Sequence, residues 1–560
     1  MRQRLCDYAI LLTIGAILTL PNLGATSLWD VDEGVNAQAA REMYENETWI
    51  IPTFNYQLRT AKPVMLYWLQ RVSYSLFGMN EWAARWPSVL AAWLTVLGVY
   101  ELARRMFDRA TGLLAGIVLA SACEFCLLAH AATPDATLLL FTVLTYCLFW
   151  MGHENGSRRW WIPTAAACGL AMLTKGPVGV ALPGLVVLLY FAWNRELGRL
   201  WDRRLVVAVL VFVLVAGPWY TLVAVETRGE WVRVFFGREN LQRFSTPMEN
   251  HSGPFFYHAV ALLILFTPWS VFLPAALWYG AQGSRSATGW PADTTTYARP
   301  YRFLVVWFVA YLVFFSMAAT KLPNYMLPAY PAIAILTARF LIVWQRGTLA
   351  APQWLMPAAM GGLVLTAVAV AVGLLIAGGA WPVLPPAARV FPGLERWAFL
   401  GLIPLATAGV MLWAWRSNHR QRFLQAATVG AIAFTASVAA FPPVVIDGYK
   451  AAKELVETSG VADPARDIRL AHHDWFQPSI VFYAGRQVTE LPSAEAVATF
   501  LAIPTPGYLF VPERTWRQLE SQVNVPTQIV AQDYDFYKNC QVLVVSNGVA
   551  FGPAIAATPR

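Results

Sequence analysis

Long apolar runs are the feature that most constrains the fold of this chain. Stretches of about 17 to 25 mostly apolar residues, long enough to cross the hydrocarbon core of a bilayer, recur as far as about residue 441 of its 560 residues. With 57% hydrophobic and 13% charged residues, the chain carries more apolar surface than a soluble protein of this size can bury. Since lipid cannot satisfy open backbone groups, the runs predict an all-α polytopic membrane protein.

These runs predict about 13 transmembrane helices. Only Lys175-Gly-Pro177 separates the fifth and sixth runs, so a single broken span, and one crossing fewer, stays open. The first run lacks a convincing cleavage site, and we interpret it as a retained span rather than a signal peptide. The predicted spans are residues 8–25, 82–103, 111–130, 135–151, 160–174, 176–193, 205–225, 255–279, 302–319, 324–344, 355–379, 397–415 and 423–441.

Basic residues predict how these spans are oriented. Loops rich in Lys and Arg alternate with loops poor in them, which places the N-terminus and the basic loops in the cytoplasm and the C-terminus outside. The alternation holds only if residues 160–174 and 176–193 both cross. Because these loops account for the net charge of +8, no nucleic acid partner is predicted. The basic loops are residues 104–109, 157–159, 194–204, 285–302, 345–346 and 416–422.

Two loops on the predicted outer side are long and charged. Residues 27–81 include amphipathic stretches at Val35–Glu47 and Pro63–Leu76, which we expect to lie along the membrane interface. Residues 226–254 carry four arginines on the side where the positive-inside rule expects few. We expect the two loops to form the functional site of a transmembrane domain that covers residues 1–441.

From about Pro442 the sequence changes from long apolar runs to short ones. Short strands separated by helices predict a small α/β domain, residues 442–560, on the outer side. The predicted strands are 468–472, 480–483, 508–511 and 542–545, and the predicted helices are 448–457, 493–502 and 513–521.

Two groups of metal-binding residue types have simpler explanations. Cys123 and Cys126 have CxxC spacing but lie inside a predicted span, where we interpret them as packing residues. His472-His473-Asp474 is interpreted as a surface or structural group of the C-terminal domain. No metal ion and no cofactor are therefore predicted, and metal dependence stays open.

Charged and polar residues at the outer ends of the spans form the candidate site. Their types suit a substrate that carries phosphate and sugar, and the predicted topology places all of them on one side of the membrane. Several also have structural explanations: Asp135 offsets a helix dipole, Lys175 and Lys321 are interfacial anchors, and Arg243 pairs with Glu239. The set is Asp32, Glu33, Lys62, Asp135, Lys175, Glu239, Arg243, Lys321 and Tyr325.

Ordered motifs in residues 1–345 carry a family resemblance. They are Val31–Met43, Lys62–Trp68, Thr133–Asp135, Thr174–Pro177, Phe236–Phe244 and Thr320–Pro328. The chain resembles the type C glycosyltransferases that use polyprenyl phosphate sugars, and most closely the aminoarabinose transferases that modify lipid A. The predicted spans and outer domain agree with the fold of that family.

The resemblance implies an inverting transfer of 4-amino-4-deoxy-L-arabinose from undecaprenyl phosphate to a lipid A phosphate, which gives resistance to cationic peptides. It places the reaction on the periplasmic face of the bacterial inner membrane, with the two lipids and the bilayer as partners of a monomer. It implies a catalytic set of Asp32, Glu33 and Asp135, and a lipid phosphate-binding set of Lys62, Glu239, Arg243, Lys321 and Tyr325.

Elementary chemistry is consistent with these roles. Lys62 and Arg243 are suited to neutralise the charge that grows on a leaving phosphate. A phosphate acceptor hardly needs deprotonation, so we expect Asp32 to orient the acceptor or the amino sugar and to stabilise an oxocarbenium-like centre. A hydroxyl acceptor would instead require Asp32 as a base.

Other functions stay open. Within the same class, a transferase that moves mannose or another sugar from a polyprenyl phosphate to a protein or glycan hydroxyl would have the same Asp-Glu pair. A scaffold with a sensory outer domain would leave the charges at the outer ends unexplained. A lipid flippase or transporter should place ionisable residues in mid-span and show repeated halves, whereas here the charges lie at the outer ends of the spans.

Overall fold

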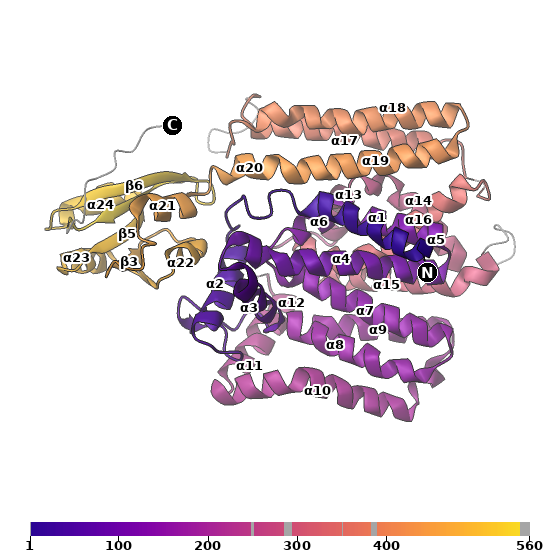
Figure 1. The fold of residues 1–560 in the computed structure, drawn as a ribbon, viewed down its shortest axis with the longest axis horizontal. Coiled ribbons are helices and arrows are strands. Elements are labelled where there is room, and N and C mark those ends of the chain that lie inside the picture. Colours follow the sequence, from indigo (N-terminus) through magenta and orange to yellow (C-terminus); the bar gives the residue numbers. More distant parts are fainter. Residues whose placement is uncertain (1, 248–250, 285–293, 350, 382–388, 549–560) are drawn as a thin grey trace.

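Helices overlap each of the predicted membrane spans in the computed structural model, which describes residues 2–247, 251–284, 294–349, 351–381 and 389–548 (Figure 1). They are α1 (Arg2–Thr19), α4 (Glu81–Met106), α5 (Arg109–Ala120) with α6 (Cys123–Ala129), α7 (Pro134–Glu154), α8 (Trp161–Lys175), α9 (Val178–Trp193), α10 (Arg203–Glu226), α13 (Tyr257–Leu265) with η4 (Trp269–Phe272) and α14 (Leu273–Ser284), α15 (Thr294–Met317), η5 (Pro323–Ala329) with α16 (Tyr330–Gln345), α17 (Leu355–Ala377), η6 (Leu394–Gly401) with α18 (Leu402–Arg416), and α19 (Arg420–Ala440) with α20 (Pro442–Asp447).

The chain is a multi-pass membrane protein. Among the described residues, 8 helices are long and apolar enough to cross a membrane, or up to 10 if each of two bent pairs is one span. The count of thirteen stays a prediction, because α8 and α9 have only 15 and 16 residues. Part of the predicted basic loop 285–302 lies outside the described residues.

The two bent pairs meet at their bends. The axes change direction by 66° between α5 and α6 and by 118° between α13 and η4–α14. At these breaks Cys123 N donates to Thr267 O over 3.0 Å, and the Trp269 indole donates to Ser121 Oγ over 2.9 Å. Polar groups at one break are therefore hydrogen-bonded to polar groups at the other. Non-helical backbone inside a membrane requires such partners within the protein.

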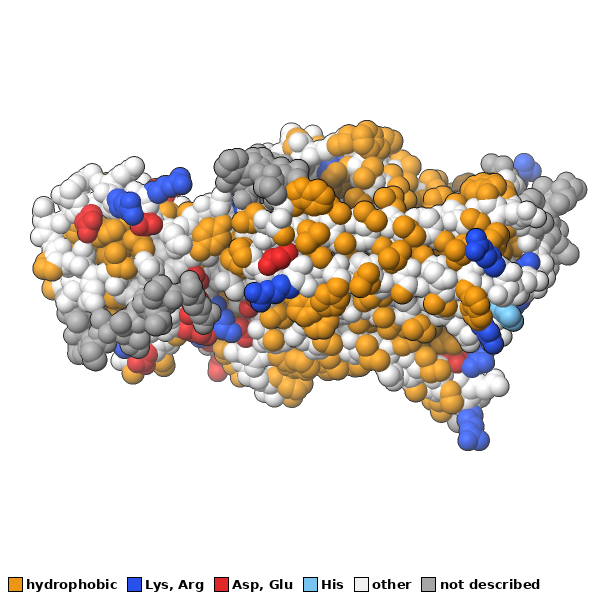
Figure 2. All heavy atoms as spheres, turned by 90° about the horizontal axis from the view of Figure 1, so that it is seen from above, with side chains coloured by type: hydrophobic (Ala, Val, Ile, Leu, Met, Phe, Trp, Pro, Cys, Tyr) orange, Lys and Arg blue, Asp and Glu red, His pale blue; other side chains and the backbone are white. Residues whose placement is uncertain are grey.

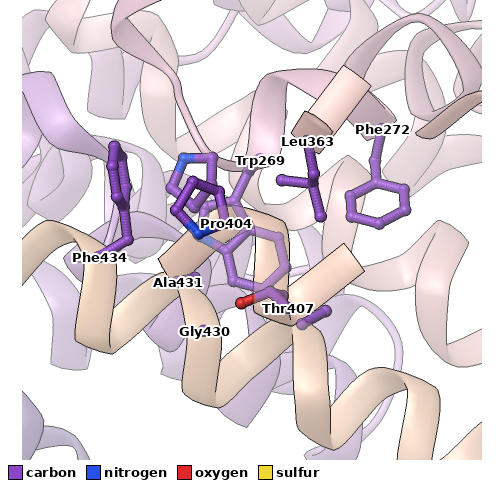
Figure 3. A pocket seen from close by; sticks show the side chains of 10 residues that line it. Trp269, Phe272, Leu363, Pro404, Thr407, Gly430, Ala431 and Phe434 are labelled. Atoms are coloured by element: carbon purple, nitrogen blue, oxygen red, sulfur yellow. The ribbon is translucent and has the colours of Figure 1, made fainter. Parts of the chain in front are cut away.

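Burial separates a central helix from helices at the periphery. All residues of an 18-residue apolar window within Pro323–Gln345 are buried, whereas only 22% of the corresponding windows of α10 and α17 is. Figure 2 shows hydrophobic side chains over the middle of the molecule and basic side chains at the end away from the C-terminal sheet. A small pocket between η4, α17, α18 and α19 is lined mainly by apolar residues such as Trp269, Leu363, Pro404 and Phe434 and by no charged residue (Figure 3).

Short elements follow the first long helix on the predicted outer side. They are α2 (Asp32–Glu45), the antiparallel pair β1 (Thr53–Phe54) and β2 (Gln57–Leu58), and α3 (Met65–Phe77). The amphipathic stretches at Val35–Glu47 and Pro63–Leu76 therefore lie mostly in helices α2 and α3, and their place at the membrane interface stays a prediction. In α3 the Met65 and Tyr74 side chains are buried while Val72 and Leu76 are exposed, so the helix has one buried and one exposed apolar face, as a helix at a membrane interface would.

The second long outer segment is also helical. It consists of α11 (Glu230–Val234), a π-helix labelled η3 (Phe235–Gln242) and α12 (Arg243–Ser245). Residues 248–250 of the predicted loop 226–254 lie outside the described residues. On the opposite, predicted cytoplasmic side the short connecting helices are η1 (Arg158–Trp160) and η2 (Leu197–Leu200).

The C-terminal sheet domain is a mixed five-stranded sheet in the order β4-β3-β5-β7-β6. Strand β3 pairs in parallel with β4 and β5, while β7 pairs antiparallel with β5 and β6. Helices α21 and α22 pack with one apolar cluster of the sheet, and α23 and α24 with another. The elements are α21 (Ala451–Ser459), β3 (Arg469–His472), α22 (Ser479–Ala484), β4 (Val488–Glu490), α23 (Ala494–Ala502), β5 (Gly507–Pro512), α24 (Glu513–Leu519), η7 (Glu520–Gln522), β6 (Gln528–Asp535) and β7 (Cys540–Ser546).

The strand predicted at 480–483 is wrong, because these residues form helix α22. Pro478 precedes the helix, and Gly485 ends it with a φ of 63° that favours glycine. Residues 480–482 are all buried, because α22 packs between α21 and α2. A short helix that is apolar on every side gives no helical periodicity, so its β-branched residues predicted a strand.

The predicted orientation can be tested with single cysteines in a variant that lacks the native ones. A Thr499→Cys variant should react with a membrane-impermeant thiol reagent in intact spheroplasts, and Gly198→Cys should react only after the membrane is opened. Both positions are exposed, so access and not burial limits the reaction. Labelling of position 198 from outside would reverse the orientation derived from the basic loops.

Candidate active site

Glu33 is enclosed by an ion pair that holds the first outer segment to α4. Arg85 and Glu33 are each 2% exposed and form two parallel bonds, Nη2 to Oε2 over 2.7 Å and Nε to Oε1 over 2.9 Å. Glu33 also accepts from Trp29 N over 2.8 Å and from Ala132 N over 2.6 Å. Burial opposes ionisation, yet Arg85 and these donors hold the pKa of Glu33 below its usual range.

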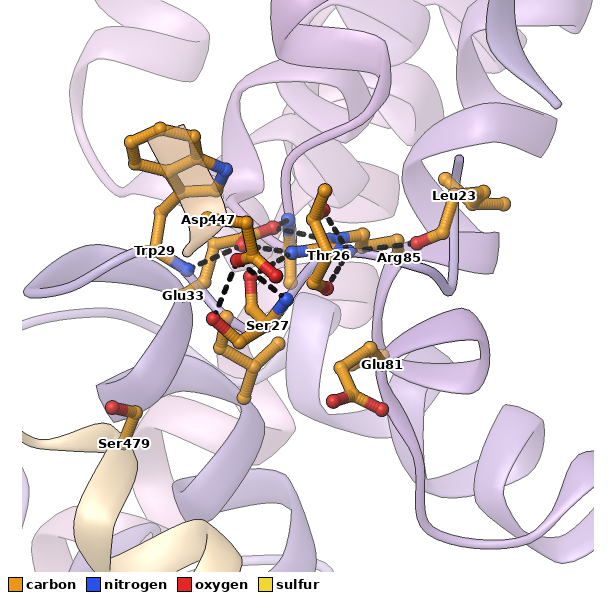
Figure 4. Close-up of polar contacts among 12 residues, drawn as sticks. Leu23, Thr26, Ser27, Trp29, Glu33, Glu81, Arg85, Asp447 and Ser479 are labelled. Carbon is orange, nitrogen blue, oxygen red and sulfur yellow. Dashed lines mark hydrogen bonds and ion pairs between the residues drawn. The ribbon is translucent and has the colours of Figure 1, made fainter. Parts of the chain in front are cut away.

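The same guanidinium organises the chain before Glu33. Arg85 donates to Leu23 O over 2.7 Å, to Thr26 O over 2.8 Å and to Ser27 O over 2.8 Å (Figure 4). An arginine inside a predicted span was the only sequence signal for this role. Each carboxylate oxygen of Glu33 accepts two hydrogen bonds from the protein, so Glu33 fixes the position of the segment.

Asp32 precedes Glu33 in the sequence but is exposed, whereas Glu33 is buried. Asp32 lies in the first turn of α2. Within the described part of the chain its carboxylate forms no hydrogen bond or ion pair. Of the adjacent acids that the sequence singled out, only Asp32 is therefore available to a ligand.

Asp135 joins three of the predicted motifs. Its Oδ1 lies 2.6 Å from Lys175 Nζ and accepts from Asn324 Nδ2 over 3.2 Å. The Lys175 ammonium also lies 5.6 Å from the centre of the Tyr325 ring. The structure thus brings Asp135, Lys175 and Tyr325 together, and adds Asn324, which lies in the Thr320–Pro328 motif but was not singled out.

Lys62 is a partly buried cation among other cations. Burial, followed by the charges of Lys175 and Arg243, lowers the pKa of Lys62 to about 8. Arg59 acts in the same direction, whereas the charges of Asp32 and Asp135 oppose them. No ion pair or hydrogen bond of the Lys62 ammonium occurs among the described residues. This environment is suited to an anion that would supply the missing negative charge.

The remaining predicted residues have local partners. Arg243 lies 3.5 Å from Glu239, which is also 3.9 Å from Arg238. Lys321 is 5% exposed, and its ammonium donates to Phe315 O over 3.1 Å and to Ser316 O over 2.6 Å. Lys321 therefore caps the carbonyl end of α15, and we assign it a structural role beside the site.

The residues described here contain no group of three or more His, Cys, Asp or Glu side chains placed to hold a metal ion. In the sequence His472–Asp474, His473 Nδ1 lies 2.7 Å from Leu491 O and is used in a structural bond.

Replacing Arg85 by Met should destabilise the protein strongly, because Glu33 would remain buried without its partner. Loss of one member of a buried pair typically costs about 3–5 kcal/mol. The matched control is Arg105→Met on the same helix, whose pair with Glu154 is half-exposed and should contribute about 1 kcal/mol or less. Thermal unfolding in detergent measures both, and equal melting temperatures would contradict the role of Arg85.

Comparisons with known proteins agree with the motifs. Residues 61–220 match the family described as dolichyl-phosphate-mannose-protein mannosyltransferase. The undecaprenyl phosphate-α-4-amino-4-deoxy-L-arabinose arabinosyl transferase of Erwinia tasmaniensis is 33% identical over 344 residues, which are 59% of each chain. The transferase of the same name from Pseudomonas aeruginosa is 33% identical over 353 residues, 61% of this chain and 60% of the relative. The similarity thus spans about three fifths of these curated relatives.

Solved structures extend the similarity to nearly the whole chain. The crystal structure of ArnT from Cupriavidus metallidurans bound to undecaprenyl phosphate superposes with a TM-score of 0.79 at 24% identity, over 98% of this chain and 99% of the other. The oligosaccharyltransferase of Archaeoglobus fulgidus gives 0.51 at 14% identity, over 94% of this chain and 69% of the other. At these identities the likeness concerns the fold. In both sequence and fold, the chain resembles the type C glycosyltransferases, and ArnT among them.

Proposed function

We propose that this protein transfers 4-amino-4-deoxy-L-arabinose from undecaprenyl phosphate to a phosphate of lipid A, with inversion at the sugar, on the periplasmic face of the inner membrane. The sequence similarity to transferases named for this donor supports the choice of sugar and carrier. The product would carry added positive charge on the outer lipid, which weakens the attraction of cationic peptides.

The surroundings of Lys62 carry the proposal furthest. Three cations, Lys175, Arg243 and Arg59, and two carboxylates, Asp32 and Asp135, influence this partly buried ammonium. A lipid phosphate placed there would be held by Lys62 and Arg243, and the same charges would stabilise it as it leaves the sugar. Lys175 is already neutralised by Asp135 at 2.6 Å, so the pair contributes position and hydrogen bonding more than net charge.

The acids then take different roles. Asp32 is the exposed carboxylate next to the cations, and we assign it to the amino sugar or to the oxocarbenium-like centre that develops during transfer. Asp135 acts through Lys175 and Asn324, and Glu33 through Arg85. A phosphate acceptor is already ionised and hardly needs a base. This agrees with a site in which Glu33 and Asp135 are held in ion pairs.

The family match at residues 61–220 favours a second candidate, transfer of a sugar to a protein hydroxyl. Mass spectrometry of lipid A from cells with and without the gene separates the two. A mass increase of one aminopentose per phosphate is expected. Unchanged lipid A together with a newly glycosylated protein would replace the proposed acceptor.

Asp32→Ala should abolish transfer while leaving the amount and melting temperature of the protein near those of the wild type. The residue is exposed and makes no contact whose loss would open a cavity. Glu47→Ala, at an exposed acid of the same outer loop, is the control and should transfer normally. Wild-type turnover by the folded Asp32→Ala protein would remove this carboxylate from the mechanism.

The affinity for undecaprenyl phosphate should fall as the pH rises above about 8, because Lys62 loses its charge there. A phosphate monoester is fully ionised by that pH, since its second pKa is about 6. In Lys62→Gln the affinity should be weaker by about 2–4 kcal/mol and nearly independent of pH. Lys62→Arg keeps its charge at every pH tested and should bind with a flat profile too.

Binding measured by intrinsic tryptophan fluorescence in detergent distinguishes these profiles. A Lys62→Gln protein with the affinity and pH dependence of the wild type would exclude Lys62 from the phosphate site.

A further inference from the structure

The segment that leads into Asp32 is bound to C-terminal residues. Ser27 N and Oγ donate to Asp447 Oδ1 over 2.9 and 2.7 Å, as Figure 4 shows. One residue later, Leu28 N donates to the Tyr483 hydroxyl over 2.7 Å. These residues precede Asp32 by only a few positions, so the C-terminal part of the chain reaches the proposed site directly.

Asp30 makes the most extensive of these contacts. Its Oδ1 accepts from Ser479 N over 2.9 Å, and its Oδ2 accepts from the Ser479 hydroxyl. Asp30 N donates to the Tyr537 hydroxyl over 2.9 Å. A Cβ atom at Gly34 would lie 2.5 Å from Asp30 Oδ1 and 2.6 Å from Ser479 N, so only glycine lets α2 approach α22 this closely.

Lys450 adds further contacts between the C-terminal residues and the segment that leads into Asp32. Its ammonium donates to Ser27 O over 2.7 Å and lies 4.2 Å from the centre of the Trp29 ring. Lys450 is itself paired with Asp447 at 2.7 Å. The backbone of residues 27–30 is thereby enclosed by C-terminal side chains.

Asp32 lies between two such anchors. Asp30, two positions before it, is fixed to Ser479 of the C-terminal sheet domain, and Glu33, one position after it, is fixed to Arg85 of α4. Asp32 has no comparable bond of its own among the described residues. The position of its carboxylate is therefore set by two separate parts of the molecule.

We propose that the C-terminal sheet domain positions Asp32 for sugar transfer, with Ser479 and Asp30 as positioning residues. This inference rests on the proposed function. It gives the domain a direct part in the reaction, although neither residue touches the substrate. Lys175 is held by Asp135, and Lys62 makes no hydrogen bond to the segment 27–30 among the described residues, so donor binding should not depend on Ser479.

The test uses full-length Ser479→Ala, which removes one hydroxyl and keeps the backbone bond to Asp30. We expect kcat to fall by about 10- to 100-fold, as a displacement of about 1 Å can cause, with an unchanged KM for the lipid donor. The control is Ser459→Ala, a buried serine of the same domain whose hydroxyl bonds Leu455 O within its own helix. It should keep its kcat.

A double variant tests whether the two residues act through one contact. If they do, Asp30→Ala with Ser479→Ala should lose no more activity than Asp30→Ala alone. Additive losses, a wild-type kcat for Ser479→Ala, or an equal loss in Ser459→Ala would each overturn the proposal.

Hydrogen exchange gives a readout independent of transfer. Backbone amides of residues 27–35 should exchange faster in Ser479→Ala than in the wild type and be unchanged in Ser459→Ala. Unchanged exchange in Ser479→Ala would overturn the positioning role. If the wild-type protein transfers no aminopentose, the proposed function falls, while the exchange rates still decide whether the domain holds this segment.

Discussion

The buried pair of Glu33 and Arg85 is the interaction on which the geometry of the outer face depends. Two side chains that are each 2% exposed meet through two parallel bonds, and the same arginine binds three carbonyl groups of residues 23–27. A buried pair of this kind contributes little net stability compared with apolar packing. Its value here is geometric, because it fixes where a loop leaves the membrane and where the next helix begins.

Adjacent residues can have opposite roles because the helix separates their directions. Successive side chains in an α-helix point about 100° apart, so Asp32 and Glu33 at the start of α2 face different surroundings. Glu33 faces Arg85 in the interior, and Asp32 faces the exposed side near Lys62. The charges of the two lysines also differ. Asp135 neutralises Lys175, whereas Lys62 has more cations than carboxylates among its charged neighbours.

The helical architecture and much of the candidate site could be predicted from the sequence. Apolar length located the membrane helices, and the motifs placed Asp135, Lys175 and Tyr325 on one side, where they do lie together. Spacing could not separate Asp32 from Glu33, because that depends on Arg85 from another helix. Lys321 was predicted to bind phosphate, but its ammonium is directed to the carbonyls of α15, a contact that appears only once the chain turns back on itself.

The C-terminal domain was the least predictable part. Its helix α22 has buried residues throughout and no periodicity, and strand β4 has only three residues. Pairings such as Asp30 with Ser479 join positions 449 residues apart. No local pattern marks such a contact, since an acid in a loop and a serine before an apolar run are both common.

The shortness of α8 has a consequence for how deep the site lies. Its 15 residues extend about 22 Å at 1.5 Å per residue, whereas the hydrocarbon core is about 30 Å thick. Lys175 at its far end would then stop below the level of the lipid headgroups, with Asp135 as its counter-ion. Under the proposed function, a lipid phosphate drawn toward this depth would move inward from its own leaflet, and its polyprenyl chain would stay in hydrocarbon while the sugar faced the outer loops.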